Sequence, residues 1–117
     1  MGRAAAVSFM KPIPPKLRQE MDSDPWYHRC AITGNFFAIE WHHVKVNGRQ
    51  YSEKFCIIPL SKKIHDRAYE RAVKERLEWI MVCRASPEEI KRHRLEQMAG
   101  YLTKKYGRYD QAARYKI

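Results

Sequence analysis

Aromatic and β-branched residues gather in two short runs near the middle of the chain. The first run, residues 36–46, and the second, residues 55–58, are each typical of a β-strand. Asn47-Gly48 follows the first run and favours a tight turn, and Pro59 is expected to stop the second strand. The pattern therefore predicts a β-hairpin with an enlarged connecting loop.

After the hairpin, the apolar positions recur at helical spacing. A helix is predicted over residues 62–84. Ser86-Pro87 then starts a second helix, in which Glu89 closes a capping box, and this helix is expected to run to Tyr106 and end at Gly107. The residues of the first helix that should face the core are Tyr69, Ala72, Val73, Leu77, Ile80 and Met81.

The beginning of the chain differs from this pattern. Lys11-Pro12-Ile13-Pro14-Pro15 is rich in proline, which favours extended backbone, and residues 16–21 are expected to form a short helix before a turn. We therefore predict an extended proline-containing arm over residues 1–25 and one domain over residues 26–117, which ends in a basic tail. The mixture of a hairpin and helices in 117 residues predicts a small α+β fold.

Charge adds a class of partner to this picture. The chain has 23 Lys and Arg residues against 13 Asp and Glu residues, a formal net charge of +10. Residues 41–117 carry 18 basic and nine acidic groups, so nearly all of the excess positive charge, +9, lies in this part of the chain. Such a surface is typical of proteins that bind nucleic acid, and a solvated basic surface with no specific partner is the alternative.

Cysteine usage and hydropathy restrict the compartment. The three cysteines are odd in number and widely spaced, which favours reduced thiols in a cytoplasmic protein. No apolar run approaches the roughly 18 residues of a membrane span, and the first residues lack the apolar core of a signal peptide. We therefore expect a cytoplasmic protein that does not cross a membrane.

Candidate chemistry concentrates in Glu40-Trp41-His42-His43-Val44 and in His65, which together hold three of the five histidines. Neighbouring residues of a strand point to opposite faces, so His42 and His43 would do different work. One imidazole could bind a divalent cation while another takes a proton near neutral pH. Phosphodiester hydrolysis needs both a base for water and a cation for the developing charge. A pair of ordinary strand histidines is the alternative.

With these residues identified, the sequence resembles the HNH endonuclease family, the ββα-metal finger. The resemblance runs through Cys30-Ala31-Ile32-Thr33-Gly34, Trp41-His42-His43-Val44, Cys56-Ile57-Ile58-Pro59-Leu60 and His65-Asp66, within residues 26–70. Many members are phage-encoded, and some are RecA-dependent recombination-enhancement nucleases. The resemblance implies a DNA-cutting enzyme in the bacterial host cytoplasm, working with DNA and with a recombination or other DNA-processing protein.

The resemblance also assigns roles by position. His43 corresponds to the general base, and His42 and His65 correspond to metal ligands. The implied cofactor is a divalent ion: Mg²⁺, Mn²⁺, Zn²⁺ or Ni²⁺. Glu53, Asp66 or Glu70 could complete its coordination, and Glu40 could support an imidazole.

The chain departs from the family pattern at several positions. Cys56 replaces the asparagine that orients the catalytic histidine, and Tyr69 replaces a further histidine, so both are candidate supporting residues. Only Cys30 is left of the zinc-binding cysteine pairs. Packing of Trp26, Phe37 and Trp41 is therefore expected to hold the loops.

These departures keep a second function open, a non-catalytic nucleic-acid-binding protein on a degenerate HNH scaffold. In either case a basic group near the finger would hold the phosphate backbone. His28 is expected to pack or hydrogen-bond in its turn, and His93 to be solvated or to face phosphate. The candidate basic group consists of Lys45, Arg49, Lys62, Lys63 and Arg67.

Overall fold

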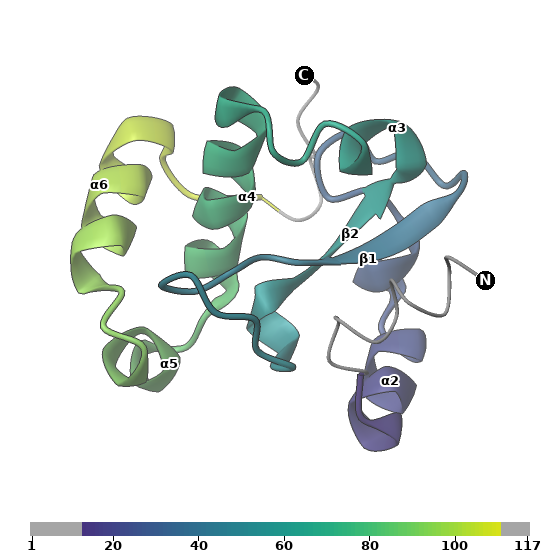
Figure 1. Cartoon of the computed structure of the whole chain (residues 1–117), viewed down its shortest axis with the longest axis horizontal. Coiled ribbons are helices and arrows are strands. Elements are labelled where there is room, and N and C mark those ends of the chain that lie inside the picture. Colours follow the sequence, from purple (N-terminus) through teal and green to yellow (C-terminus); the bar gives the residue numbers. More distant parts are fainter. Residues whose placement is uncertain (1–12, 111–117) are drawn as a thin grey trace.

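The computed structural model describes residues 13–110. Helices and one two-stranded antiparallel sheet confirm an α+β fold (Figure 1). Residues 1–12 of the predicted arm and residues 111–117 of the predicted tail lie outside the described part. The elements are α2 (Pro15–Asp22), the 3-10 turn η1 (Pro25–His28), β1 (Ile39–His43), the 3-10 turn η2 (Lys54–Cys56), β2 (Ile57–Ser61), α3 (Lys62–His65), α4 (Arg71–Arg84), α5 (Pro87–Arg92) and α6 (Glu96–Tyr106).

The predicted hairpin is confirmed, although β1 is shorter than expected and β2 begins and ends later than expected. β1 and β2 pair antiparallel, with Glu40 opposite Leu60 and His43 opposite Ile57. The connecting loop contains the tight turn expected at Asn47-Gly48, where φ is 52° and 77°. An isolated bridge between Val46 and Arg49 closes this turn. Left-handed backbone at both central positions explains why an Asn-Gly pair stands there.

Pro59 lies inside β2, so the prediction that it would stop the strand is wrong. Val44 N donates to Cys56 O and Lys62 N donates to Ala38 O, which places the even-numbered residues of β1 in the hydrogen-bonded pairs. Pro59, opposite Trp41, therefore falls at a position whose backbone nitrogen points away from β1. The missing N–H of proline therefore removes no hydrogen bond between β1 and β2.

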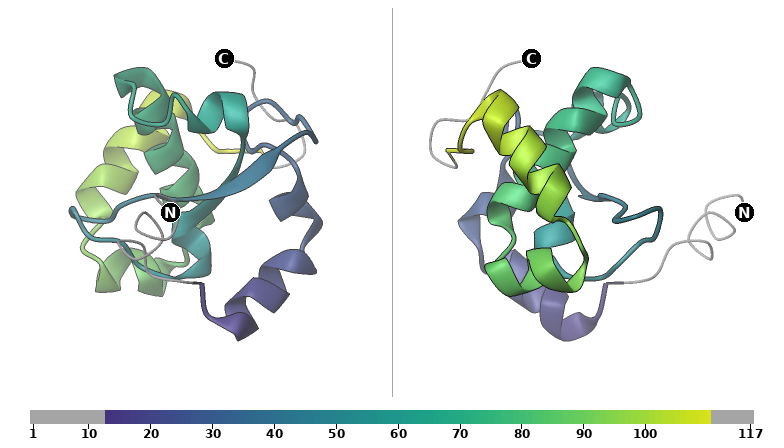
Figure 2. Two further views of the ribbon diagram at one scale, coloured as in Figure 1. Left: turned by 45° about the vertical axis from the view of Figure 1, so that its right-hand side comes forward. Right: turned by 90° about the vertical axis from the view of Figure 1, so that its left-hand side faces the viewer.

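The hairpin lies between two groups of helices (Figures 1 and 2). On one side, α4 packs against β2 and against α6. On the other side, α2 packs against η1, and Met21 of α2 is fully buried in the same core as Ile57 and Leu77. Residues far apart in sequence thus share one core. No helix within residues 13–110 has the length and apolar character needed to cross a bilayer.

The single helix predicted over residues 62–84 is two helices. The short α3 ends at His65, residues 66–70 form turns, and α4 begins at Arg71. Val73, Leu77, Ile80 and Met81 are buried as predicted, whereas Ala72 is exposed. Tyr69, predicted to face the core, is 77% exposed because it lies in the turn before α4. The break redirects the chain so that Ile64 and Val73 both enter the core.

The second predicted helix starts and ends as expected but is interrupted. Ser86 accepts from Glu89 N, and the Glu89 carboxylate accepts from Ser86 N, which confirms the capping box. The helix stops at Arg92, and α6 resumes at Glu96. Gly107 follows α6 with a φ of 80° and is its C-cap as predicted.

Aromatic packing holds the N-terminal loops, although not by all the residues expected. Trp26 is buried under the Arg84 guanidinium, which lies 3.5 Å from its ring centre. Trp41 Nε1 donates to Tyr27 O at 3.0 Å. Phe37 is 79% exposed, so its predicted packing role is wrong. Cys30, Cys56 and Cys83 are free thiols.

Candidate functional site

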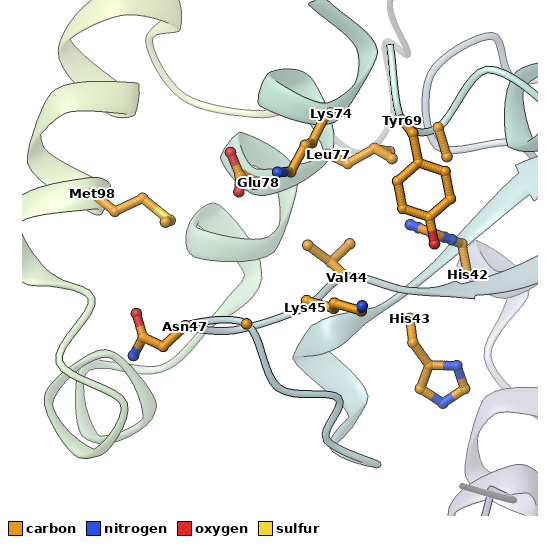
Figure 3. A pocket seen from close by; sticks show the side chains of 12 residues that line it. His42, His43, Val44, Lys45, Asn47, Tyr69, Lys74, Leu77, Glu78 and Met98 are labelled. Carbon is orange, nitrogen blue, oxygen red and sulfur yellow. The ribbon is translucent and has the colours of Figure 1, made fainter. Parts of the chain in front are cut away.

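Strand β1 presents its polar residues on two faces. Glu40 and His42 both lie against His65 of α3. The His43 ring projects from the face of the strand opposite to the His42 ring (Figure 3). This division follows from the two-residue period of a strand, as predicted. The structure therefore brings His42 together with His65 and separates the His43 ring from both.

His42 and His65 form a close pair of imidazoles. Their ring centres are 5.0 Å apart, with the planes inclined by 66°. The Glu40 carboxylate lies 2.6 Å from Nδ1 of His65. Because a carboxylate can only accept, Nδ1 carries the proton, and the lone pair of neutral His65 is on Nε2. Carboxylates orient metal-binding histidines by the same kind of contact, and Glu40 lies against an imidazole as that role would require.

Burial keeps His42 neutral. The side chain is 9% exposed, and this burial, with the neighbouring charges of His65 and His43, lowers its pKa to about 4. At neutral pH the ring therefore carries no proton charge. A neutral imidazole is the form that binds a metal ion.

Two imidazoles fit part of the coordination sphere of a divalent cation. Within residues 13–110, no three His, Cys, Asp or Glu side chains are grouped so that they could hold a metal ion. The acids considered as further ligands are engaged elsewhere: Glu53 with His93, Asp66 with Lys62 and Glu70 with Arg67. The donor set suits an ion that keeps several water or substrate ligands, and two nitrogens favour zinc, nickel or manganese.

His43 has a different environment. It is 9% exposed, and neither ring nitrogen has a hydrogen-bond partner among the described residues. Burial lowers its pKa, so the ring is neutral and one nitrogen has an unused lone pair. An unpartnered buried polar group costs free energy, and such groups are often explained by function. His43 and His42 both line one cavity between β1 and α4.

Cys56 and Tyr69, the two other candidate supporting residues, differ in position. Cys56 is fully buried in the core, and burial raises the pKa of its thiol to about 12, so it stays protonated. It offers no thiolate to a metal and no hydrogen bond to His43. Tyr69 is exposed, and its ring centre lies 6.1 Å from that of His42. Tyr69 therefore borders the histidine pair without supplying an imidazole.

The basic residues near the hairpin and α3 fall into two groups. Lys62 pairs with Asp66 at 3.1 Å, and Arg67 pairs with Glu70 at 3.0 Å. These exposed pairs are weak, so a phosphate could displace either carboxylate. Lys45, Arg49 and Lys63 are exposed and make no ion pair within the described part of the chain.

The His93 side chain is only 9% exposed, so the prediction that it is solvated or faces phosphate is wrong. Its ring packs against Tyr51 and Phe55, and Nε2 lies 3.0 Å from a Glu53 oxygen. Its carbonyl accepts from Asn47 Nδ2 at 2.8 Å. Because α5 ends just before His93, the ring turns inward. The hydrogen bond from Asn47 ties the hairpin loop to the end of α5. His28 Nε2 is 2.8 Å from Asp22 O, the hydrogen bond expected in its turn.

Sequence reasoning missed the cavity beside the histidines. It has a volume of about 320 Å³ and reaches from His42 along α4 to α6. Glu78 and Met98 line it, although they are 20 residues apart in sequence. The pairing of α4 with α6 brings them together, and no local sequence signal indicates that contact.

Comparison with family models, with curated proteins and with solved structures finds no match for this chain.

Proposed function

We propose that this protein is a metal-dependent endonuclease of the HNH type that hydrolyses DNA phosphodiester bonds. The observation that carries the proposal is the His42–His65 pair, whose ring centres are 5.0 Å apart and whose second member is oriented by Glu40. The adjacent His43, buried and without a hydrogen-bond partner within the described residues, supplies a neutral imidazole from the other face of β1, at the cavity that His42 also lines. The resemblance to the ββα-metal finger implies the same roles for these three histidines.

In the proposed reaction, His43 accepts a proton from a water molecule as the water oxygen attacks phosphorus. A P–O bond forms with the attacking oxygen, and the bond from phosphorus to the 3′ oxygen breaks. The leaving oxygen takes a proton from solvent. Lys45, Arg49 and Lys63 would hold the phosphate backbone through charge, since they make no ion pair in residues 13–110.

His42 and His65 would hold the divalent cation, each through one ring nitrogen. Such a cation stabilises negative charge on the phosphate and on the leaving oxygen. Glu40 keeps the lone pair of His65 on Nε2 by accepting from Nδ1. The two nitrogen ligands favour Mn²⁺, Zn²⁺ or Ni²⁺, and Mg²⁺ is the alternative that tolerates few protein ligands.

The test replaces the proposed base. In His43→Ala, nicking of supercoiled DNA should fall by roughly 10²- to 10⁴-fold, the usual contribution of a general base, while metal binding persists. The matched control is His28→Ala, which removes a histidine hydrogen-bonded in its own turn. Nicking by His43→Ala at the parent rate would contradict the role of His43.

The metal site has a separate test. Calorimetric titration with Mn²⁺, Zn²⁺, Ni²⁺ and Mg²⁺ should give one site per chain, and His42→Ala or His65→Ala should abolish it. If the parent protein binds none of these ions and cuts DNA equally well with a chelator, the metal-dependent mechanism is wrong.

A second candidate is a non-catalytic DNA-binding protein on the same scaffold. Two observations favour it: the asparagine position holds the buried Cys56, and the further histidine position holds the exposed Tyr69. This candidate predicts salt-sensitive DNA binding without stoichiometric metal binding. We propose DNA as the partner in both cases, and a phage recombination or other DNA-processing system as the setting.

A further inference from the structure

The cavity beside the histidine pair extends from His42 and His43 to α4 and α6, and the proposed hydrolysis assigns no role to the part formed by those two helices. Its volume of about 320 Å³ is at the lower end of the range of small-molecule pockets, which suits one aromatic ring system. Val44 of the hairpin, Leu77 of α4 and Met98 of α6 form apolar walls (Figure 3). The flat faces of a nucleobase pack well against such walls.

The cavity has one acidic lining residue, Glu78, among apolar and basic side chains. Glu78 lies one position after Leu77 on α4 and is half-buried. Burial raises the pKa of its carboxyl group. No hydrogen bond to its carboxylate is found among the described residues. A carboxylate inside a pocket matches the edge of guanine, which presents two neighbouring N–H donors.

The mouth of the cavity has the features expected of a nucleotide site. Tyr69 is 77% exposed beside His42 and offers its ring for stacking. Lys45 and Lys74 also border the cavity, and both are exposed cations that a phosphate could contact. A base inside would leave its own phosphate at the mouth, next to the His42–His65 pair.

We propose that this cavity binds one unpaired nucleobase of the DNA substrate, with a preference for guanine, and so directs the protein to DNA that contains an unpaired nucleotide. The inference rests on the proposed function because it takes DNA as the ligand. It adds a substrate class, since a fully paired duplex offers no base that can enter without being unstacked.

The test measures binding without cleavage. Three fluorescein-labelled duplexes are compared, which carry one bulged guanine, one bulged adenine or no bulge. Fluorescence anisotropy measures the affinity of the parent protein for each duplex in buffer that contains a chelator. The guanine bulge should bind at least about 10-fold more tightly than the paired duplex, in line with the usual strength of base stacking on protein side chains. Equal affinity for all three duplexes would overturn the proposal.

Two variants locate the binding to the cavity. Met98→Trp fills the space and should erase the preference for bulged DNA, whereas its control Gln97→Trp, on the exposed side of α6, should keep it. Glu78→Gln should reduce the preference of guanine over adenine while the general preference for a bulge persists. Its control, Glu88→Gln, removes the same charge from exposed α5. An unchanged bulge preference in a folded Met98→Trp protein would overturn the assignment.

Circular dichroism establishes that each variant is folded. If Met98→Trp does not fold, the proposal is tested with Glu78→Gln and Tyr69→Ala instead, since both side chains are at least partly exposed. The proposal would then be rejected if Glu78→Gln keeps the guanine preference of the parent protein and Tyr69→Ala keeps the parent's affinity for bulged DNA. Because no cleavage is needed, bulge-specific binding by a protein that never cuts DNA would support the cavity and reject only the nuclease.

Discussion

His42 and His43 are neighbours in sequence, yet their imidazoles have opposite surroundings. His42 faces another imidazole that is held by a carboxylate, and His43 has no hydrogen-bond partner in the described part of the chain. Strand periodicity predicts that the two rings point to different faces. It does not predict that Glu40 reaches His65, 25 residues away, because that contact depends on the register that pairs Glu40 with Leu60.

The buried state of His42 has a consequence for stability. Its pKa is lowered to about 4 from an ordinary value of 6.5, so between these pH values the unfolded chain binds a proton that the folded chain does not. Stability is therefore expected to fall as the pH drops from 6.5 to about 4, by on the order of 3 kcal/mol for this group. Burial lowers the pKa of His43 as well, which acts in the same direction.

Urea unfolding at a series of pH values, in metal-free buffer, measures this effect. His42→Gln should lose less stability than the parent protein between pH 6.5 and about 4, because its side chain does not titrate. His28→Gln is the control, since it removes an exposed histidine. Identical pH profiles for His42→Gln and the parent would show that His42 is protonated equally easily in both states.

At the scale of elements, the break between α5 and α6 is a Schellman motif. Leu95 N donates to Ile90 O and Arg94 N donates to Lys91 O, and Arg94 has a φ of 56°. This left-handed position is usually glycine. The sequence predicts a continuous helix here because an arginine gives no sign of a helix end, whereas Ser86-Pro87 and Gly107 are recognisable signals and their predictions are confirmed.

Replacement of Arg94 by glycine should therefore stabilise the fold. A residue with a Cβ is strained at this φ, and removal of that strain is expected to raise the free energy of unfolding by roughly 0.5–1 kcal/mol. Thermal and urea denaturation measure the change. The control Lys91→Gly lies in the last turn of α5, where backbone is right-handed, and should instead destabilise by a similar amount. A lower free energy of unfolding for Arg94→Gly would mean that contacts of the arginine side chain stabilise the fold by more than the strained backbone destabilises it.

For the molecule as a whole, the sequence predicts the class of fold and the hairpin better than the helix boundaries. Hydrophobic runs and the Asn-Gly turn are local signals, so the hairpin is found. The division of residues 62–84 into α3 and α4 has no proline or glycine to mark it. The cavity that borders the histidine pair is formed only when α4, α6 and the hairpin meet, and this depends on the tertiary arrangement.

Net charge is also a property of the whole molecule, and it predicts how DNA binding depends on salt. With a formal charge of +10, the affinity for duplex DNA should fall linearly with salt on logarithmic axes as counterions are released. Combined replacement of Lys45, Arg49 and Lys63 by alanine should reduce that slope by about 3. Fluorescence anisotropy between about 50 mM and about 200 mM salt measures it.

A matched triple variant separates local contacts from total charge. Replacement of Lys16, Lys91 and Lys104 by alanine removes the same charge from α2, α5 and α6, which lie on other parts of the surface. This control should change the slope much less. Equal slopes in the two triple variants would mean that no localised surface holds the phosphates.

Pro59 also determines what the sheet can do beyond its own two strands. The outer side of β2 offers no N–H at this residue, and its carbonyl already accepts from Ala31 N at 2.8 Å. An edge strand with free donors and acceptors can recruit a strand from another chain, which is a common route to aggregation. The centre of this edge is closed by a proline and a capping loop, so the hairpin resists sheet extension along β2.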